Sequence, residues 1–391
     1  MSLSEHGDTG RRIAAVRSGR RMKQAQLAAA ANISLSMLRK IEQGSRRVTP
    51  EMLVAIAEAL GVDPGHLSGT PTLTDSRVHA AIPEVRRVIG SFDLPEDGPI
   101  RPTRDLDDAV RDAIDWRLAS QYAALVRAIP TLLEELIRAV HAYAGHDRER
   151  AAGQLALAYR AADGVAFKYG YLDLSARLIE LMRWAADQSG DELVVAAAAY
   201  VRTEIFFADR NLGPALRALE AAAARIQSTA TPDSAAAYGS LHMRAAVVAA
   251  RSGKAGAARD HLREAKEAAG LVREGVYHGT AFGRSSVRIH EVAVNVELGD
   301  GDAAVRAAGN WEPPLQLPAE RRSHYYIDLA RAQLWTGRRE EAFTSLQHAR
   351  RIAPQHTREH PQVREMLTTL LRLQRASRDS LLGFASWARV I

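Results

Sequence analysis

Apolar side chains in the first seventy residues recur three or four positions apart, which is the period of an amphipathic helix. Polar and small residues interrupt this pattern at short intervals. The apolar residues therefore fall into five short helical segments, which we place at residues 10–21, 24–31, 34–43, 49–60 and 63–67. Helices this short are marginal alone, so the pattern predicts that they pack together as one compact five-helix unit.

The breaks between these segments carry helix-start and helix-stop signals. Ser34 is a good N-cap, and Gly44 suits the residue that follows the last turn of a helix. Thr49-Pro50 combines an N-cap with a proline at the first helical position, and Asp63-Pro64 repeats this signal. The second and third segments, joined by a three-residue turn, form a helix-turn-helix arrangement.

Longer helices, arranged in pairs, are predicted from residue 104 onward. The two helices of each pair are separated by turns that begin at Asn211, Gly253, Gly299 and Gly337. Small residues just after these turns let the paired helices approach closely: Ala215, Ala258, Ala304 and Ala342. This arrangement resembles the tetratricopeptide repeat, although the turns lie 42, 46 and 38 residues apart instead of about 34. We expect the helices between Leu106 and Trp184 to join the same stack, with residues 171–176 as an eroded turn.

The segment between these two helical blocks is rich in proline. Residues 70–103 contain Pro71, Pro83, Pro95, Pro99 and Pro102, and one helix from Arg77 to Ile89, interrupted or begun near Pro83. A segment of this kind is typical of an interdomain connection. The predicted organisation is therefore an N-terminal domain at residues 1–69, a linker at 70–103 and a helical repeat domain at 104–391.

The composition supports an all-α chain, and the positions of the charged residues show where the positive charge is concentrated. Alanine, leucine, arginine and glutamate are abundant, aromatic residues make up 6% and β-branched runs are scarce. The net charge of +6 is small for 391 residues, but residues 11–47 hold ten bases against one acid, Glu42. Residues 70–391 hold 42 bases and 40 acids. A local basic block on a nearly neutral body indicates a polyanionic partner.

Several classes of protein are excluded by the same composition. The absence of cysteine rules out disulfides, thiolate metal sites, iron–sulfur clusters and a cysteine nucleophile. The longest strongly apolar stretch has nine residues, far fewer than the ~20 that span a bilayer. The first residues carry no apolar signal segment. We therefore expect a cytoplasmic protein with no membrane partner.

The helix-turn-helix segment resembles the Xre-type family of phage repressors. The resemblance covers about residues 10–68 and rests on four motifs: Gln24-x-x-Leu27-Ala28, Ile33-Ser34, Leu38-x-x-Ile41-Glu42-x-Gly44 and Leu60-Gly61-Val62. At Ala25 and Asn32 the family more often has an acid and a glycine. The resemblance implies a five-helix lambda-repressor-like domain, followed in this chain by a tetratricopeptide-like α-solenoid.

The resemblance also implies a DNA-binding surface: Gln24, Ser34, Leu35, Ser36, Met37, Arg39, Lys40, Ser45, Arg46 and Arg47. Gln24 would contact a phosphate at a helix N-terminus. Leu35, Ser36 and Lys40 would face base edges beside Met37 and Arg39, and residues 45–47 would hold the DNA backbone. Arg17 and Glu42 match a structural ion pair of the family. The alternative is that these charges are only solvated surface.

Direct base readout by this surface is limited. Leu35 and Ser36 cannot form the bidentate hydrogen bonds that arginine makes with guanine or glutamine with adenine. Leu35 would instead pack on a thymine methyl group. Specificity would then depend on Arg39, Lys40 and DNA shape.

Polar residues also recur at one position of the repeats, nine residues before each turn. These are Arg202, Arg244, His290 and Asp328, accompanied in the last repeat by Tyr325 and Tyr326. Stacked repeats form a superhelix with a binding groove, so Arg202, Arg244, His290, Tyr325 and Asp328 are our candidates for an effector site, which Lys168, Arg183 and Trp184 would extend. The alternative is that they are exposed or form contacts between repeats.

One motif resembles a catalytic site without the necessary context. His356-x-x-Glu359-His360 matches a zinc-peptidase pattern, which requires both imidazoles on one helical face. Here it lies between Pro354 and Pro361, in what the sequence predicts to be a loop between repeats. Gly299-Asp-Gly-Asp follows a helix instead of a strand, so it is not a dinucleotide loop. We expect no metal, no cofactor and no enzymatic activity.

Together these features predict a sequence-specific transcription regulator. A repeat domain that dimerises would place two recognition helices about one DNA turn apart and favour a palindromic operator. Double-stranded DNA, a second copy of the chain and a small molecule or peptide in the repeat groove are the expected partners. Two alternatives remain: an interaction scaffold whose N-terminal domain only anchors it, and a constitutive repressor that has no effector.

Overall fold

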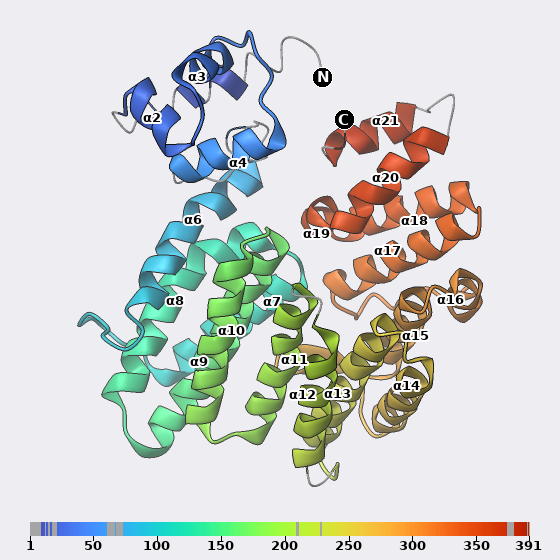
Figure 1. Cartoon of the computed structure of the whole chain (residues 1–391). Helices are drawn as coiled ribbons and strands as arrows, with labels where there is room; N and C mark the ends of the chain where they lie inside the picture. The colour runs from blue at the N-terminus through green and yellow to red at the C-terminus, as the bar shows by residue number, and fades with distance from the viewer. Residues whose placement is uncertain are drawn as a thin grey trace. The chain divides into compact units, whose positions relative to one another are not determined.

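The computed structural model in Figure 1 describes residues 9–11, 13–14, 16–17, 22–60, 67, 73–208, 211–226, 229–373, 379–388 and 390. The chain divides into two compact units, residues 1–81 and 82–391. Within the described residues, the secondary structure is helical except for two strands of three residues each. The all-α class predicted from the sequence is confirmed.

The first unit contains the predicted helix-turn-helix. Residues described between 9 and 17 are helical, and three helices follow: α2 (Gln24–Ala30), α3 (Leu35–Glu42) and α4 (Pro50–Ala59). Their apolar positions form one core in which these side chains are completely buried: Ile13, Leu27, Leu38, Ile41, Ile56, Leu60 and Leu67. The predicted end of the first segment, at residues 18–21, and the start of the fifth, at Asp63-Pro64, lie outside the described residues.

The boundary between the two units, after residue 81, falls within helix α6 (Leu73–Gly90). This helix contains the one predicted between Arg77 and Ile89. The expected interruption at Pro83 is wrong, because the helix continues on both sides of this residue. We retain the domain borders after residues 69 and 103 as a proposal.

The second unit is a stack of helix pairs. The pairs are α7 (Thr103–Leu118) with α8 (Tyr122–Ala142), α9 (Gly145–Lys168) with α10 (Leu172–Ser189), α11 (Glu192–Ala208) with α12 (Leu212–Arg225), α13 (Pro232–Arg251) with α14 (Ala255–Gly270), α15 (Arg284–Glu297) with α16 (Gly301–Ala308), and α17 (Ala319–Trp335) with α18 (Arg339–Ile352). Successive first helices also contact one another, so α9, α11, α13, α15 and α17 form a continuous row, which we call the first-helix row. This is the arrangement of a tetratricopeptide-like α-solenoid, as predicted.

The turns within the pairs form where the sequence places them. Gly253, Gly299 and Gly337 have φ angles of +70°, +79° and +80°, in the left-handed region that glycine enters without steric cost. The small residues after the turns, including Ala258 and Ala304, are completely buried. Close approach of the paired helices thus depends on small side chains at this position.

After α18, the described residues form three more helices: α19 (Pro354–Glu359), α20 (Pro361–Leu373) and α21 (Asp379–Trp387). The predicted loop at residues 354–361 is wrong, because Pro354 occupies the first turn of α19, where a proline costs no hydrogen bond. Phe384 and Leu367 join the core formed by α17 and α18. The C-terminal helices therefore cover the end of the stack.

A β-hairpin, which the sequence did not indicate, lies between α14 and α15. Strands β1 (Gly275–Tyr277) and β2 (Thr280–Phe282) are antiparallel, with Tyr277 opposite Thr280. Phe282 is completely buried. Arg117 donates to the Gly279 carbonyl, and Arg160 donates to the His278 carbonyl and to Thr280 Oγ1. Side chains from α7 and α9 thus hold a turn that is more than one hundred residues away in sequence.

The second unit also closes on itself. Helix α7 contacts α17, and Arg117 lies 3.8 Å from the Glu320 carboxylate. The Tyr122 backbone N–H at the start of α8 donates to Gln355 Oε1 of α19 over 3.0 Å. The beginning and end of the stack are therefore joined by direct contacts.

Candidate nucleic-acid interface

An ion pair joins the first helical segment of the domain to α3, the second helix of the helix-turn-helix. Arg17 Nε and Nη2 donate to the two carboxylate oxygens of Glu42 over 2.7 and 3.0 Å, and Arg17 Nη1 donates to the Met22 carbonyl. The hydrogen bond to Glu42 raises the pKa of the Arg17 guanidinium. The ion pair implied by the resemblance is thus present. Gln24 Nε2 also donates to Glu42 over 2.7 Å. The Gln24 side-chain amide is therefore hydrogen-bonded inside the domain.

The turn before α3 is fixed by its own side chains. Ser34 Oγ accepts from the Met37 backbone N–H over 3.1 Å, as an N-cap does. Asn32 adopts a φ of +52°, the left-handed conformation for which the family uses glycine. Asparagine tolerates this conformation better than most residues. This departure from the family pattern therefore preserves the turn.

Helix α3 presents a polar face. Ser36, Arg39 and Lys40 are exposed, and Arg39 and Lys40 follow Ser36 by three and four positions, which places them on the same side of the helix as Ser36. Gln43, also exposed, continues this face by one turn. It is absent from the predicted DNA-binding residues, although its spacing in the sequence is the same. Arg39 and Lys40 supply positive charge along this side.

Leu35 and Met37 are less exposed than the residues on the polar face of α3. Both are half-buried, and both pack against the core of the first unit. Any base contact by Leu35 would therefore use only the part of its side chain that the core leaves uncovered.

The loop after α3 adds further positive charge. Ser45, Arg46 and Arg47 are exposed, and Ser45 Oγ donates to the Lys40 carbonyl over 3.0 Å. Gly44 has a φ of +73° and ends the helix, as predicted. The loop thus leaves α3 at a defined angle, with two arginines close in sequence to Arg39 and Lys40.

In the second unit, two of the candidate effector residues share one buried polar network. Arg244 stacks on the Tyr200 ring, 5.0 Å from its centroid, and donates to Thr203 Oγ1 over 2.7 Å. Arg321 donates to the Tyr200 hydroxyl over 3.0 Å and lies 3.3 Å from His290 Nε2. Burial first, and then Arg321, lowers the pKa of His290 to about 3. His290 and Arg244 are thus brought together by the first-helix row.

Two other candidates lie further along α17. Asp328 is 3% exposed, and burial raises the pKa of its carboxyl to about 7. Tyr325 is 1% exposed and donates its hydroxyl to the Trp311 carbonyl over 3.0 Å, within the core between α15 and α17. This burial removes Tyr325 from the surface that we consider for an effector.

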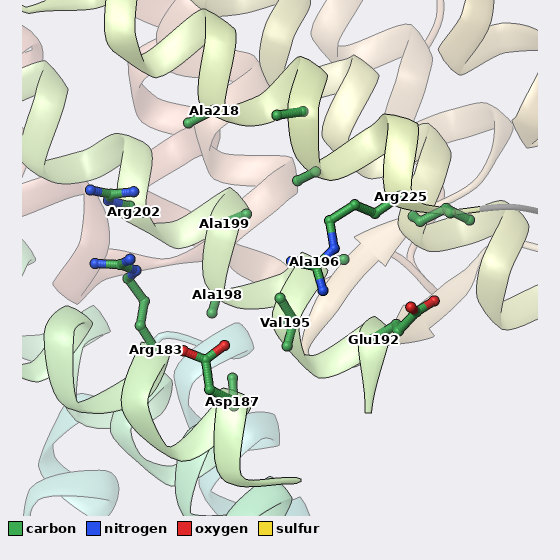
Figure 2. A pocket seen from close by; sticks show the side chains of 14 residues that line it. Arg183, Asp187, Glu192, Val195, Ala196, Ala198, Ala199, Arg202, Ala218 and Arg225 are labelled. Carbon is green, nitrogen blue, oxygen red and sulfur yellow. The ribbon is translucent and has the colours of Figure 1, made fainter. Parts of the chain in front are cut away.

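Arg202 lies in a separate pocket of about 400 Å³ between α10, α11 and α12. Arg183, Arg202 and Arg225 line it together with Asp187, Glu192 and several alanines. Figure 2 shows the guanidinium groups of Arg183 and Arg202 toward one end of the pocket. The alanines give a smooth apolar wall, while the arginines provide hydrogen-bond donors for an anionic group.

Comparison with known proteins bears mainly on the first unit. Residues 13–67 match the family model described as helix-turn-helix. The first unit is therefore a helix-turn-helix DNA-binding domain of the Xre type, as found in DNA-binding regulators. No curated protein matches the chain at a significant level.

Three solved structures are similar to this chain at low identity. PlcR from Bacillus thuringiensis, in complex with the peptide PapR7 and DNA, is 17% identical, covers 68% of this chain and 95% of its own, and has a TM-score of 0.30. A point mutant of PrgX and the PrgX/iCF10 complex are each 10% identical over 97% of this chain, with TM-scores of 0.24, and cover 99% and 95% of their own chains. Such TM-scores are too low to identify a common fold.

Among the described residues, no helix combines the length and the apolar character that crossing a membrane requires.

Proposed function

We propose that this chain is a homodimeric, sequence-specific transcription regulator whose α3 helix contacts a palindromic operator. The observation that carries the proposal is the exposed set of Arg39, Lys40, Arg46 and Arg47 on α3 and the loop after it. The one acid within this block, Glu42, is neutralised by Arg17. The surface therefore presents an excess of positive charge, which suits the phosphates of duplex DNA.

Base readout is assigned to the exposed side of α3. Ser36, Arg39 and Lys40 project from it, with Gln43 one turn further on. A helix in the major groove reads bases with side chains spaced in this way, and Arg or Lys pairs with guanine. Gln24, Ser34, Leu35 and Met37 then support the helix or contact the DNA backbone, and Ser45 positions the loop.

The experiment is a binding titration of duplex operator, selected from genomic DNA, at several salt concentrations. The double variant Lys40→Ala/Arg46→Ala should bind about 10–100-fold more weakly and, because Arg46 contacts phosphate, reduce the slope of log K against log salt by about 1. Arg259→Ala, which removes an exposed arginine from α14 of the second unit, is the matched control. Equal affinity and equal slope for the two variants would refute the proposed surface.

Dimerisation requires its own measurement. Two copies that bind together should protect two half-sites about 34 Å apart. Light scattering of the full chain on its operator should therefore give two chains per duplex. One chain per duplex, on a single half-site, would contradict the dimer.

We assign the effector to the second unit and favour a small molecule or peptide with an acidic group. The pocket at Arg202 contains three arginines and an apolar wall, and its volume is in the range of small-ligand sites. The partly exposed Arg244, with the His290 network behind it, is the other polar group that we assign to effector recognition. Asp328 is about as buried as Tyr325, so we do not assign it to this surface.

A ligand screen tests this assignment. Acidic peptides and small dicarboxylates that raise the melting temperature of the wild-type chain should have no such effect on Arg202→Met. A compound that stabilises the chain should also change operator affinity. Operator affinity that responds to none of these compounds would indicate the constitutive repressor instead.

A further inference from the structure

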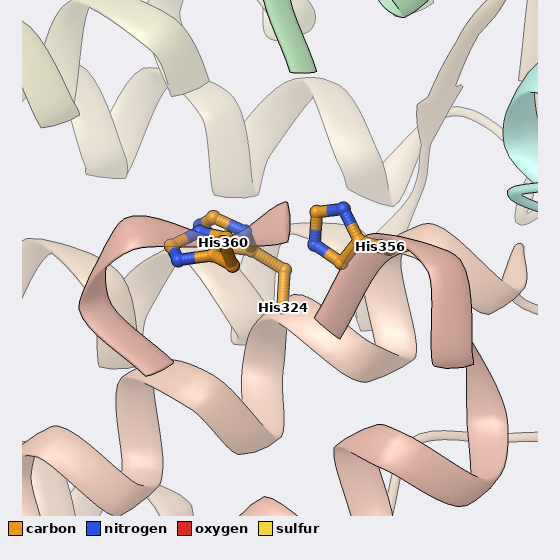
Figure 3. A group of neighbouring side chains, drawn as sticks. All are labelled: His324, His356 and His360. Carbon is orange, nitrogen blue, oxygen red and sulfur yellow. The ribbon is translucent and has the colours of Figure 1, made fainter. Parts of the chain in front are cut away.

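Three histidines from two segments of the second unit meet at one place (Figure 3). His324 belongs to α17, His356 lies within α19, and His360 follows the last residue of α19. Their ring centroids are 5.2 to 5.9 Å apart in all three pairs. One ring nitrogen from each residue lies within 4.8 Å of the other two.

We propose that His324, His356 and His360 form a binding site for one divalent transition-metal ion, with Zn²⁺ as the reference ion. Imidazole nitrogen is a preferred ligand of Zn²⁺, Co²⁺, Ni²⁺ and Cu²⁺. Around a tetrahedral Zn²⁺ with Zn–N distances of about 2.0–2.1 Å, the nitrogens lie roughly 3.4 Å apart. Small rotations of the three rings would bring the nitrogens, now at most 4.8 Å apart, to this geometry.

Two of the three rings have buried nitrogens without a hydrogen-bond partner among the described residues. His356 is completely buried, and neither of its ring nitrogens has a hydrogen-bond partner among the described residues. His360 Nδ1 is also buried and has no hydrogen-bond partner among the described residues. Buried polar atoms without partners are rare and costly, and a bound ion satisfies them. A purely structural role would not explain why His356 and His360 bring such nitrogens together beside His324.

Asp328 completes the site as a positioning residue. Its Oδ2 lies 3.6 Å from His324 Nε2 and has no hydrogen-bond partner among the described residues. Metal-ligating histidines commonly donate their second N–H to a carboxylate, which orients the ring. His324 would then bind the ion through Nδ1 while Nε2–H faces Asp328.

The nearest positive charges do not prevent ion binding. Lys168 and Arg321 are positive charges that act electrostatically on both His324 and His356. Lys168 Nζ, however, is 3.3 Å from the Glu320 carboxylate, so its charge is paired. Three protein ligands leave a fourth position for water or for a carboxylate from a bound ligand.

The experiment uses the full chain, freed of metal with a chelator and titrated with Zn²⁺ alone by calorimetry. We expect one ion per chain, and a rise in melting temperature when Zn²⁺ is added. Replacement of Zn²⁺ by Co²⁺ should give the intense visible absorption of a four-coordinate site. A wild-type chain that binds no ion, or binds it without this absorption, overturns the proposal.

Variants separate this site from adventitious binding. His324→Ala is the main one, because this side chain is 40% exposed and its loss should not prevent folding. It should weaken Zn²⁺ binding at least 100-fold, and Asp328→Asn should weaken it by about 10–100-fold. His146→Ala removes a histidine whose side chain is 89% exposed and should change nothing. Equal Zn²⁺ affinity in His324→Ala and the wild type would show that the ion binds elsewhere.

Discussion

A single backbone conformation at Asn32 determines how α2 leads into α3. Its φ of +52° would cost most residues energy, and β-branched residues most of all. The family usually has glycine at this position, and asparagine is the next most tolerant choice. A change in residue type at this position therefore does not mean a change in the turn.

The effect of a substitution at Asn32 on stability should depend on how easily the new residue adopts a left-handed backbone conformation. Asn32→Gly should leave the first unit as stable as the wild type, whereas Asn32→Val should destabilise it by roughly 1–2 kcal/mol. Hydrogen exchange of peptides from α2 and α3 measures this difference within the full chain. Faster exchange in Asn32→Gly than in Asn32→Val would contradict the role of the left-handed conformation.

At this scale, the sequence predicts best what depends on near neighbours. The caps at Ser34 and Thr49 and the helix end at Gly44 are as expected, because each depends on atoms within a few residues. The bond between Gln24 and Glu42 and the burial of Tyr325 were not predicted. Both depend on which helix faces which, and a local pattern does not contain that information.

At the scale of elements, the hairpin depends on one glycine in α13. A Cβ atom built on Gly239 would lie 2.0 Å from Phe282 Cζ, so only glycine leaves room for the Phe282 ring. The hairpin itself was missed because its strands have three residues each, too few to show a period. Its partners Arg117 and Arg160 lie far away in the sequence.

Gly239→Ala should therefore destabilise the second unit. The added methyl forces Phe282 out of a filled site, which typically costs about 1–3 kcal/mol. Gly256→Ala, in the first turn of α14, is the control, because a Cβ there meets nothing within 4 Å, and it should not destabilise the unit. Thermal unfolding followed by circular dichroism distinguishes the two. A Gly239→Ala chain as stable as the control would disprove the close contact.

At the scale of the whole molecule, the carboxylate of Glu320 joins distant helices. It lies 3.3 Å from Lys168 of α9 and 3.8 Å from Arg117 of α7. Burial alone would raise the pKa of Glu320, but Lys168, Arg117 and Arg321 outweigh burial and lower it to about 2. The charged form is thus favoured by folding.

The lowered pKa of Glu320 determines the pH range over which this carboxylate stabilises the folded chain. An acid whose pKa is lower in the folded chain stabilises it above the unfolded value of about 4.3, and this stability is lost as the pH falls toward 2. Glu320→Gln should remove roughly 3 kcal/mol at pH 7 and little at pH 2. Urea unfolding at several pH values measures the difference, with exposed Glu365→Gln as control. A loss that does not vary with pH would contradict this account.

The sequence predicted the stack of pairs but not its closure. Paired helices are encoded by periodicity and by turn glycines, both of which are local. The contact between α7 and α17 depends on the accumulated rotation of all the pairs between them, so no motif marks it. The same holds for His324, which joins His356 only in the folded chain.

Closure of the stack alters how it should unfold. Open repeat arrays have free ends, and their stability is close to a sum over neighbours, so they can lose terminal repeats first. Here Arg117 ties α7 to both the hairpin and α17, while Gln355 ties α19 to the start of α8. With both ends engaged, no terminal pair can detach without breaking contacts on two sides. The repeats should therefore melt together, with the cooperativity of a globular domain.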